Sequence, residues 1–301
     1  MKKLLLIINP TAGRMKVKYE LLPIISLMNA EGYEVTVQVT QYRGQARELA
    51  AAVEGYDRLA CAGGDGTLNE VICGLLEGGK SVPLGYIPCG STNDFGSSLS
   101  LPKDILEAAR NVVCGEPKGV DIGRFGDRYF SYVASFGAFT RSSYAAPQNL
   151  KNVLGHFAYI LQGIRDLSTI RREHVRVETE EGVYEDDYIL GAVTNSLSVA
   201  GIITLNANLV SMNDGKFEIM LIRFPKNPGQ LNQIIQALLS QNYDCDMMTF
   251  VSTERAVIYA DPAMDWTLDG ERAEGRECVE VTNLREAVNI ILPANNKGGA
   301  I

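Results

Sequence analysis

Residues 59–70 read LACAGGDGTLNE, and they decide the fold because an apolar segment gives way to a glycine-rich loop and then to a helical pattern. The loop places three glycines around one carboxylate, Asp65. Glycines let a ligand approach the backbone closely, and the N–H groups at a helix start attract anions. Because a carboxylate repels bare phosphate, it implies Mg²⁺ held between acid and polyphosphate. The stretch therefore predicts a phosphate-binding loop between a strand and a helix, with a purely geometric turn as the alternative.

Short apolar segments alternate with helical patterns from the start of the chain to roughly residue 125. This alternation is typical of a parallel sheet wrapped by helices. Two more polar loops follow apolar segments, Asn9-Pro10-Thr11-Ala12-Gly13 and Gly90-Ser91-Thr92-Asn93-Asp94. Open α/β sheets bind ligands at the carboxyl edge of their strands, so we expect the three loops to form one site.

From about Arg128 the pattern changes to strand-like segments with two helical interruptions, which predicts a β-rich second domain. We therefore divide the chain into an α/β domain over residues 1–127, a β-rich domain over 128–285, and a C-terminal strand and tail over 286–301.

The composition excludes several classes of protein. With 301 residues, 46% hydrophobic and 21% charged, the chain is an ordinary globular protein, and its net charge of −8 argues against a nucleic-acid partner. Six cysteines without a Cys-x-x-Cys pair indicate free thiols, and two histidines exclude a histidine-rich metal site. The sequence shows no signal-peptide core and no apolar segment long enough to span a bilayer. We expect a cytoplasmic protein that meets a membrane only peripherally.

Six short motifs, in their order and spacing, resemble those of the diacylglycerol kinase catalytic-domain family, which includes bacterial soluble lipid kinases and the sphingosine kinases. They are Asn9–Gly13, Gly63–Glu70, Gly90–Phe95, Val120–Gly123, Asn213–Gly215 and Asp269–Glu271. The resemblance covers nearly the whole chain. It implies an N-terminal Rossmann-like, parallel-sheet domain similar to those of NAD kinases and phosphofructokinases. It also implies a C-terminal β-sandwich that holds a lipid, with ATP bound between the two domains.

The resemblance further implies which residues contact ATP. They are Asn9, Thr40, Gly63, Gly64, Asp65, Gly66, Thr67, Asn69, and Ser91 or Thr92. A threonine at a strand end is also a common cap or turn residue, so this alternative stays open for Thr40. Asn93 and Asp94 are expected in a polar network beside the nucleotide, and either could instead cap a helix.

Two carboxylates flank Gly270, and we place the chemistry there. Phosphoryl transfer to a hydroxyl needs alignment, charge neutralisation by Mg²⁺ and a carboxylate that accepts the hydroxyl proton. Glu271 is the first candidate for this base and Asp269 the second. The alternative is an Asp-Gly turn of a surface hairpin.

The resemblance also implies a structural Mg²⁺ site. Asp214 and the backbone carbonyls of Ser211 and Lys216 would bind the ion, and Asp65, Asp94 and Asp121 would join through water. The family usually has proline and leucine where this chain has Asn208 and Lys216, and the lysine adds a positive charge near the metal. A metal-free Asn-Asp-Gly turn is the alternative.

Together these features predict an ATP- and Mg²⁺-dependent lipid kinase that phosphorylates a lipid alcohol, with diacylglycerol as the first choice of acceptor. An NAD kinase-like enzyme and a non-catalytic nucleotide-binding regulatory module are the alternatives. The sequence leaves the acceptor lipid, the mode of membrane recruitment and the choice between monomer and homodimer open.

Overall fold

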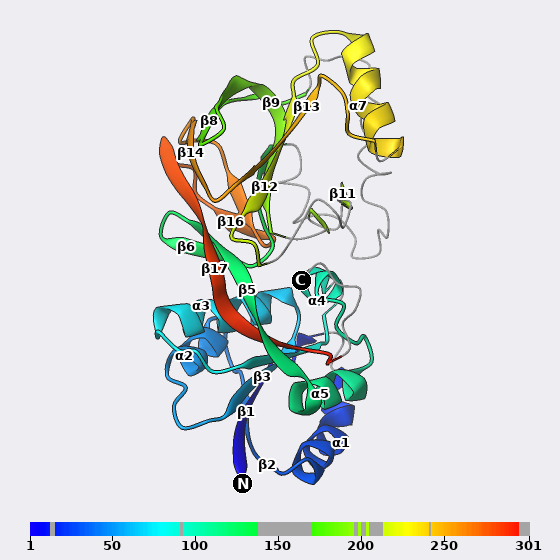
Figure 1. The fold of residues 1–301 in the computed structure, drawn as a ribbon, viewed down its shortest axis with the longest axis vertical. Coiled ribbons are helices and arrows are strands. Elements are labelled where there is room, and N and C mark those ends of the chain that lie inside the picture. The colour runs from blue at the N-terminus through cyan, green and yellow to red at the C-terminus, as the bar shows by residue number, and fades with distance from the viewer. Residues whose placement is uncertain are drawn as a thin grey trace. The chain divides into compact units, whose positions relative to one another are not determined.

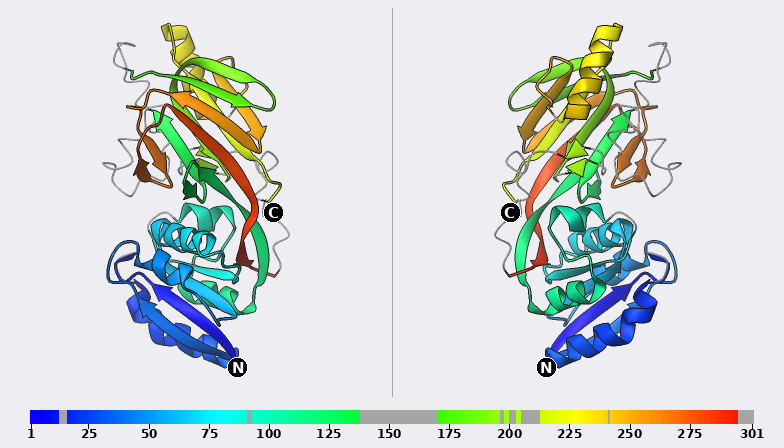
Figure 2. Two further views of the ribbon diagram at one scale, coloured as in Figure 1. Left: turned by 90° about the vertical axis from the view of Figure 1, so that its left-hand side faces the viewer. Right: turned by 90° about the vertical axis from the view of Figure 1, so that its right-hand side faces the viewer.

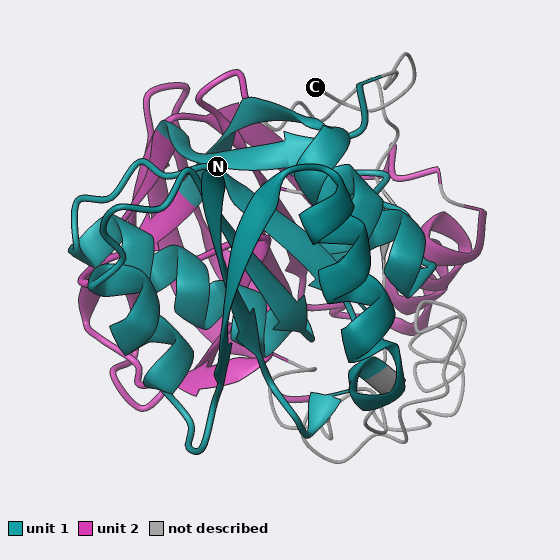
Figure 3. Cartoon of the chain, turned by 90° about the horizontal axis from the view of Figure 1, so that it is seen from below, with its two compact units in different colours: residues 1–122, 285–301 teal, residues 123–284 magenta. Residues whose placement is uncertain are grey.

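The computed structural model describes residues 1–12, 16–90, 93–137, 170–195, 198–199, 203–204, 213–240 and 242–294. The chain forms two compact units, coloured separately in Figure 3: Met1–Ile122 with Arg285–Ile301, and Gly123–Leu284. The units change at residue 122, where the sequence analysis divided the domains at 127. The C-terminal segment from Arg285 belongs to the first unit.

Strands and helices alternate through unit 1. Its elements are β1 (Lys2–Ile8), α1 (Lys16–Ala30), β2 (Tyr33–Val39), α2 (Gln45–Ala51), β3 (Arg58–Gly63), α3 (Asp65–Glu77), β4 (Leu84–Pro88), α4 (Asp94–Ser98) and α5 (Ile105–Cys114). The strands pair in parallel in the order β4-β3-β1-β2. Strands β1, β3 and β4 are largely buried, which explains why they read as continuous apolar segments, whereas the edge strand β2 is only partly buried.

Helices cover both faces of this sheet (Figures 1 and 3). On one face, α1 and α5 pack against alternate strand residues such as Leu4, Leu6 and Ala60. On the other, α2 packs against α3, and Gly74 allows their close approach because a Cβ there would lie 2.2 Å from the Arg47 carbonyl. The parallel α/β fold expected from the sequence is therefore confirmed.

Two long strands, β5 (Glu116–Phe125) and β17 (Cys278–Leu292), carry the chain between the units. The last part of β17 returns to unit 1, where Ile290 pairs with Leu84 of β4 in parallel. Asn111 of α5 holds this segment by donating its side-chain amide to the Ile291 carbonyl at 2.9 Å.

Unit 2 is built mainly from antiparallel strands (Figure 2). Its further elements are β6 (Arg128–Phe130), β7 (Val133–Gly137), β8 (Glu173–Thr179), β9 (Val183–Thr194), β10 (Ser198–Val199), β11 (Ile203–Thr204), β12 (Phe217–Arg223), α7 (Pro228–Ser240), β13 (Met248–Thr253), β14 (Arg255–Ala260), β15 (Trp266–Leu268) and β16 (Glu271–Ala273). Trp266 lies at the centre of its core, with ring centroids 4.7 Å from Phe125 and 5.0 Å from Phe136. The β-rich second part of the predicted fold is thereby confirmed.

Among the described residues, no helix is both long and apolar enough to cross a membrane.

Candidate functional site

The loops after β1, β3 and β4 meet at the carboxyl edge of the unit 1 sheet. Asn9, at the end of β1, donates its side-chain amide to the Thr67 hydroxyl of α3 at 2.9 Å. The Asn9 side-chain oxygen accepts from both the backbone and the hydroxyl of Thr11. Because these strands are parallel neighbours, their ends lie side by side, and one amide can join two loops.

The third loop, after β4, is held to the second through its backbone. The Cys89 N–H donates to the Gly63 carbonyl at 2.7 Å, and the Tyr86 hydroxyl lies 3.3 Å from the same oxygen. Asn93 fixes the turn that follows, since its Oδ1 accepts from Gly90 N–H at 2.8 Å and its amide donates back to the Gly90 carbonyl. Asn93 has φ 52°, a left-handed conformation that asparagine tolerates.

The three glycines of the loop after β3 have different surroundings. A Cβ on Gly63 would lie 2.5 Å from the Thr67 side chain, and one on Gly64 would lie 3.3 Å from the Gly90 Cα. Packing within the site therefore requires glycine at 63 and leaves only tight room for a Cβ at 64. A Cβ on Gly66, in contrast, would meet no atom within 4 Å, and its backbone is helical with no positive φ. Open space lies in front of the loop at Gly66, at the start of α3.

Asp65 and Asp94 form a carboxylate pair at this edge. Asp65 is the first residue of α3, and its Oδ2 accepts the backbone N–H of Asp94 at 3.2 Å. Burial, with a further contribution from the Asp65 charge, raises the pKa of Asp94 to about 6. The Asp65 charge disfavours the ionised form of Asp94, which favours a bound cation or a proton at this edge.

The remaining predicted nucleotide contacts occupy the same edge or fall outside the described residues. Thr40 follows β2, and its hydroxyl donates to the Ile8 carbonyl at 3.3 Å. This bond agrees with the alternative role of Thr40 as a strand-end cap. Asn69 lies one turn into α3, where its Oδ1 is 3.5 Å from the Cys73 sulfur. Ser91 and Thr92 lie outside the described residues.

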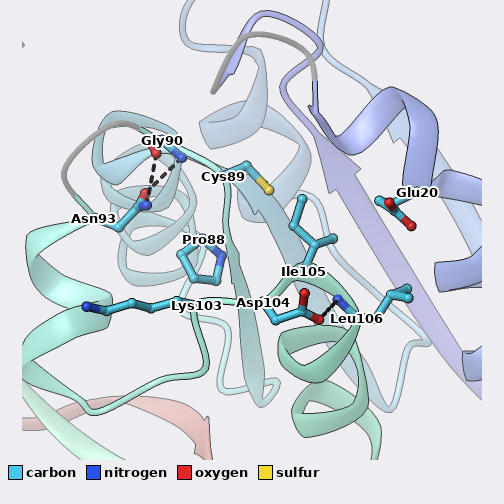
Figure 4. Close-up of a pocket in the computed structure, with 9 residues that line it drawn as sticks. All are labelled: Glu20, Pro88, Cys89, Gly90, Asn93, Lys103, Asp104, Ile105 and Leu106. Carbon is cyan, nitrogen blue, oxygen red and sulfur yellow. Dashed lines mark hydrogen bonds between the residues drawn. The ribbon is translucent and has the colours of Figure 1, made fainter.

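A cavity of about 290 Å³ lies beside the β4 loop (Figure 4). Pro88, Cys89, Gly90 and Asn93 line it from the loop, with residues 103–106 at the start of α5 and Glu20 of α1. Sequence reasoning found the loop but missed Glu20 and Lys103, because a single charged residue outside any motif gives no signal of its own.

The second group of predicted residues lies in unit 2, on the hairpin that joins β15 to β16. Leu268 pairs with Glu271, so Asp269 and Gly270 form a two-residue turn, with φ values of 48° and 83°. Positive φ at both positions is the requirement of a type I′ turn, which explains the Asp-Gly pair.

The Asp269 carboxylate is buried although it belongs to a turn. It accepts the backbone N–H groups of Ser131, Tyr132 and Val133, the last two at 3.0 Å. The hairpin is therefore fixed to the start of β7 by charge-assisted bonds. Glu271 is half-buried, and its Oε2 lies 3.9 Å from an Arg128 guanidinium nitrogen. Of the two acids, Glu271 has the more accessible carboxylate, and Asp269 positions the turn.

The residues predicted for a structural metal are divided between the units. Asp214 is exposed, and its Oδ1 accepts the Lys216 N–H at 2.9 Å, the bond of an Asx turn. The Lys216 carbonyl accepts from the Asn283 amide at 2.7 Å and keeps a second lone pair. The second Asp214 oxygen and the Lys216 carbonyl oxygen are thus ligands of the kind that a hard cation prefers. Ser211 lies outside the described residues.

Asp121 is fully buried in unit 1, where its Oδ1 accepts the Glu286 N–H at 2.7 Å. In the part of the chain that the structure describes, no three acidic, histidine or cysteine side chains gather in a metal-binding cluster.

Comparison with known proteins identifies the family to which the chain belongs. Residues 3–125 match the family described as Diacylglycerol kinase catalytic domain. The chain is 33% identical to the diacylglycerol kinase of Bacillus subtilis strain 168 over 296 residues, which cover 97% of each protein. It is 31% identical over 295 residues to the diacylglycerol kinase of Staphylococcus aureus strain MRSA252, covering 97% of this chain and 93% of that protein.

The fold is also found among solved structures. The crystal structure of a diacylglycerol kinase from Bacillus anthracis strain Sterne has a TM-score of 0.73 at 24% identity, with 97% of both chains covered. A second structure from that strain has a TM-score of 0.79 at 23% identity and the same coverage. These structures share the two-part fold of the chain.

Proposed function

Because the chain belongs to the diacylglycerol kinase catalytic-domain family and is a lipid kinase, we propose that it transfers the terminal phosphoryl group of Mg²⁺-bound ATP to the free hydroxyl of diacylglycerol. The products are phosphatidic acid and ADP. The relatives from Bacillus subtilis and Staphylococcus aureus are named diacylglycerol kinases, which supports this acceptor over other lipid alcohols.

The observation that carries the proposal is the open space in front of Gly66, where three loops meet at the sheet edge. The N–H groups at the start of α3 and the helix dipole attract the ATP phosphates there. Gly66 lets a phosphate approach the backbone, and Thr67, fixed by Asn9, presents its hydroxyl beside it. We assign Gly63, Gly64, Asn69, Thr40, Ser91 and Thr92 to the same nucleotide site.

Asp65 and Asp94 place negative charge next to this phosphate site, which favours a magnesium ion between them and the nucleotide. Bound there, Mg²⁺ would neutralise the charge that develops on the phosphoryl oxygens. Asp214, Lys216 and Ser211 would hold a second, structural ion, which Asp121 would join through water.

Glu271 is the proposed base. As the acceptor oxygen bonds to the γ-phosphorus and the bond to the ADP oxygen breaks, the hydroxyl proton passes to the Glu271 carboxylate. Asp269 is less suited to this role, because a proton on its carboxylate would weaken bonds from three backbone N–H groups. Its part is to hold Glu271 on a rigid turn.

The test is Mg²⁺-dependent transfer of labelled phosphate from ATP in detergent micelles. Diacylglycerol, sphingosine and phosphatidylglycerol are offered as acceptors, and NAD is offered separately. We expect label in phosphatidic acid, and we expect Glu271→Gln to lower turnover by roughly 10²-fold or more, the scale of a lost general base. Glu274→Gln is the matched control, because Glu274 is an exposed acid three residues further along the chain.

Full activity of Glu271→Gln would remove Glu271 from the chemistry. Label in another lipid would change the acceptor and keep the base. Label in NADP would show that NAD rather than a lipid is the acceptor, and would overturn the proposed reaction.

A further inference from the structure

Strand β12 of unit 2 carries a buried acid among apolar residues. Alternate residues of the strand, Phe217, Ile219 and Leu221, belong to the core of the unit. Because side chains alternate along a strand, the Glu218 side chain lies on the other face of the sheet. It is nevertheless only 7% exposed. Glutamate is rarely buried to this extent without a partner, so the burial of Glu218 needs a physical reason.

The two oxygens of the Glu218 carboxylate have different surroundings. Oε1 accepts the hydroxyl of Ser252, which lies opposite on β13, at 3.3 Å. Oε2 is buried and has no hydrogen-bond partner among the described residues. The hydroxyl of Thr194, opposite on β9, donates to the Tyr132 carbonyl instead. A buried carboxylate with an unused oxygen is costly unless a proton or a cation lies beside it.

The proposed structural cation site directly precedes this strand. Burial and, after it, the Asp214 charge raise the pKa of Glu218 to about 7, so the two carboxylates are near enough to repel each other. The Asn283 side-chain amide donates to the Lys216 carbonyl at 2.7 Å. The Oδ1 of the same amide is also buried without a partner in the described part of the chain. Two unused oxygens, one from a carboxylate and one from an amide, thus lie beside the turn that carries Asp214.

We propose that Glu218 is a positioning residue of the structural magnesium site, where its free oxygen accepts a hydrogen bond from a water molecule on the ion. Mg²⁺ prefers oxygen ligands and usually keeps several waters. The described residues contain no group of three acidic side chains close enough to share an ion, which places Glu218 behind such a water rather than in direct contact with the ion. A carboxylate in this position orients the water and adds negative charge to the site.

The charge of Glu218 also fits the departure of this chain from its family at residue 216. The lysine that stands there in place of leucine has an exposed side chain and adds a positive charge near the ion. Asp214 and Glu218 together balance the double charge of Mg²⁺ from within unit 2, and they offset this lysine. The inference rests on the structural ion of the proposed function, and it is independent of the acceptor lipid.

Calorimetric titration of the full chain with Mg²⁺, in the absence of ATP and lipid, tests the proposal. Glu218→Gln keeps the shape of the side chain and removes its charge, so it should weaken Mg²⁺ binding roughly 10–100-fold, the usual cost of losing such an outer partner. Asp214→Asn removes a direct ligand and identifies the binding event that belongs to this site. Glu173→Gln is the matched control and should leave the affinity unchanged. Glu173 is nearly as buried, at 8%, but it forms an ion pair with Arg171.

Thermal unfolding with and without Mg²⁺ separates this role from a merely structural one. In the presence of a chelator, Glu218→Gln should be at least as stable as the wild-type protein, because it removes a buried charge that has no partner. At a Mg²⁺ concentration that saturates only the wild-type protein, the order should reverse, because a bound ion stabilises the folded state.

Equal Mg²⁺ affinities of the wild-type and Glu218→Gln proteins, together with a lower affinity of Asp214→Asn, would overturn the proposal, because the ion would then be held without Glu218. An affinity that neither substitution lowers would remove the structural ion itself, and the role of Glu218 with it. Neither result bears on phosphoryl transfer, because the titration contains no nucleotide and no acceptor.

Discussion

Among the three glycines of the loop after β3, Gly66 is the one for which the fold supplies no reason. A Cβ on Gly63 would clash with Thr67 and one on Gly64 would lie tightly against Gly90, whereas Gly66 lies in the first turn of α3 with open space before it. Alanine is the better helix former, so glycine here costs stability unless a ligand uses the space. This contrast supports the proposal that Gly66 is kept for binding, whereas Gly63 and Gly64 lie in tight packing.

Gly66→Ala should therefore stabilise the free protein and weaken nucleotide binding. We expect the free energy of unfolding to rise by about 0.5–1 kcal/mol, the propensity difference between the two residues. We expect ATP affinity to fall roughly tenfold, because the new methyl group occupies the place of a phosphate. Thermal unfolding and calorimetric titration with ATP measure the two effects. Gly182→Ala, in a turn with room for a Cβ, is the control that should leave affinity unchanged. Unchanged affinity in Gly66→Ala would assign the loop a purely structural role.

The β15–β16 hairpin shows what an element can and cannot reveal in sequence. Its Asp-Gly pair predicts a tight turn, because local backbone chemistry alone requires positive φ there. The bonds from Asp269 to the N–H groups of Ser131, Tyr132 and Val133 are not visible in this way, since those residues are more than a hundred positions earlier. Trp266 and Leu268 gave the available hint, as apolar residues that anchor the turn in the core.

Asp269→Asn should loosen this hairpin. Asparagine tolerates the left-handed backbone, but it offers one oxygen in place of a carboxylate that accepts three N–H groups. We expect a loss of about 1.5–3 kcal/mol of stability, the range for hydrogen bonds to a charged group. Chemical denaturation measures it, and Asp265→Asn, whose partner Arg272 is exposed, is the control with a smaller expected loss. An unchanged midpoint for Asp269→Asn would contradict the anchoring role.

At the scale of the whole molecule, the chain begins and ends in the same unit. The alternation of apolar segments with helical patterns predicted the parallel sheet of unit 1. The change to strand-like segments near residue 128 predicted the β-rich structure that follows. They did not predict that β17 returns to lie beside β4, because strand pairing over some two hundred residues leaves no local signal. Unit 1 therefore depends on residues at the far end of the sequence, held by Asn111 and by buried Val288, Ile290, Ile291 and Leu292.

Ile290→Ala should destabilise unit 1 selectively, although the substitution lies near the C-terminus. Ile290 is fully buried and pairs with Leu84, so deleting its methyl groups leaves a cavity against β4. Such deletions cost about 2–5 kcal/mol in well-packed cores. Hydrogen exchange should speed up at the β3 and β4 amides while β8 and β12 stay unchanged, because opening is local to the compact unit that loses the contact. Ile258→Ala, an equal deletion in the core of unit 2, should give the reverse pattern. If Ile290→Ala instead accelerated exchange equally in both units, they would unfold as one cooperative body, and the return of β17 would stabilise the whole molecule rather than the sheet it joins.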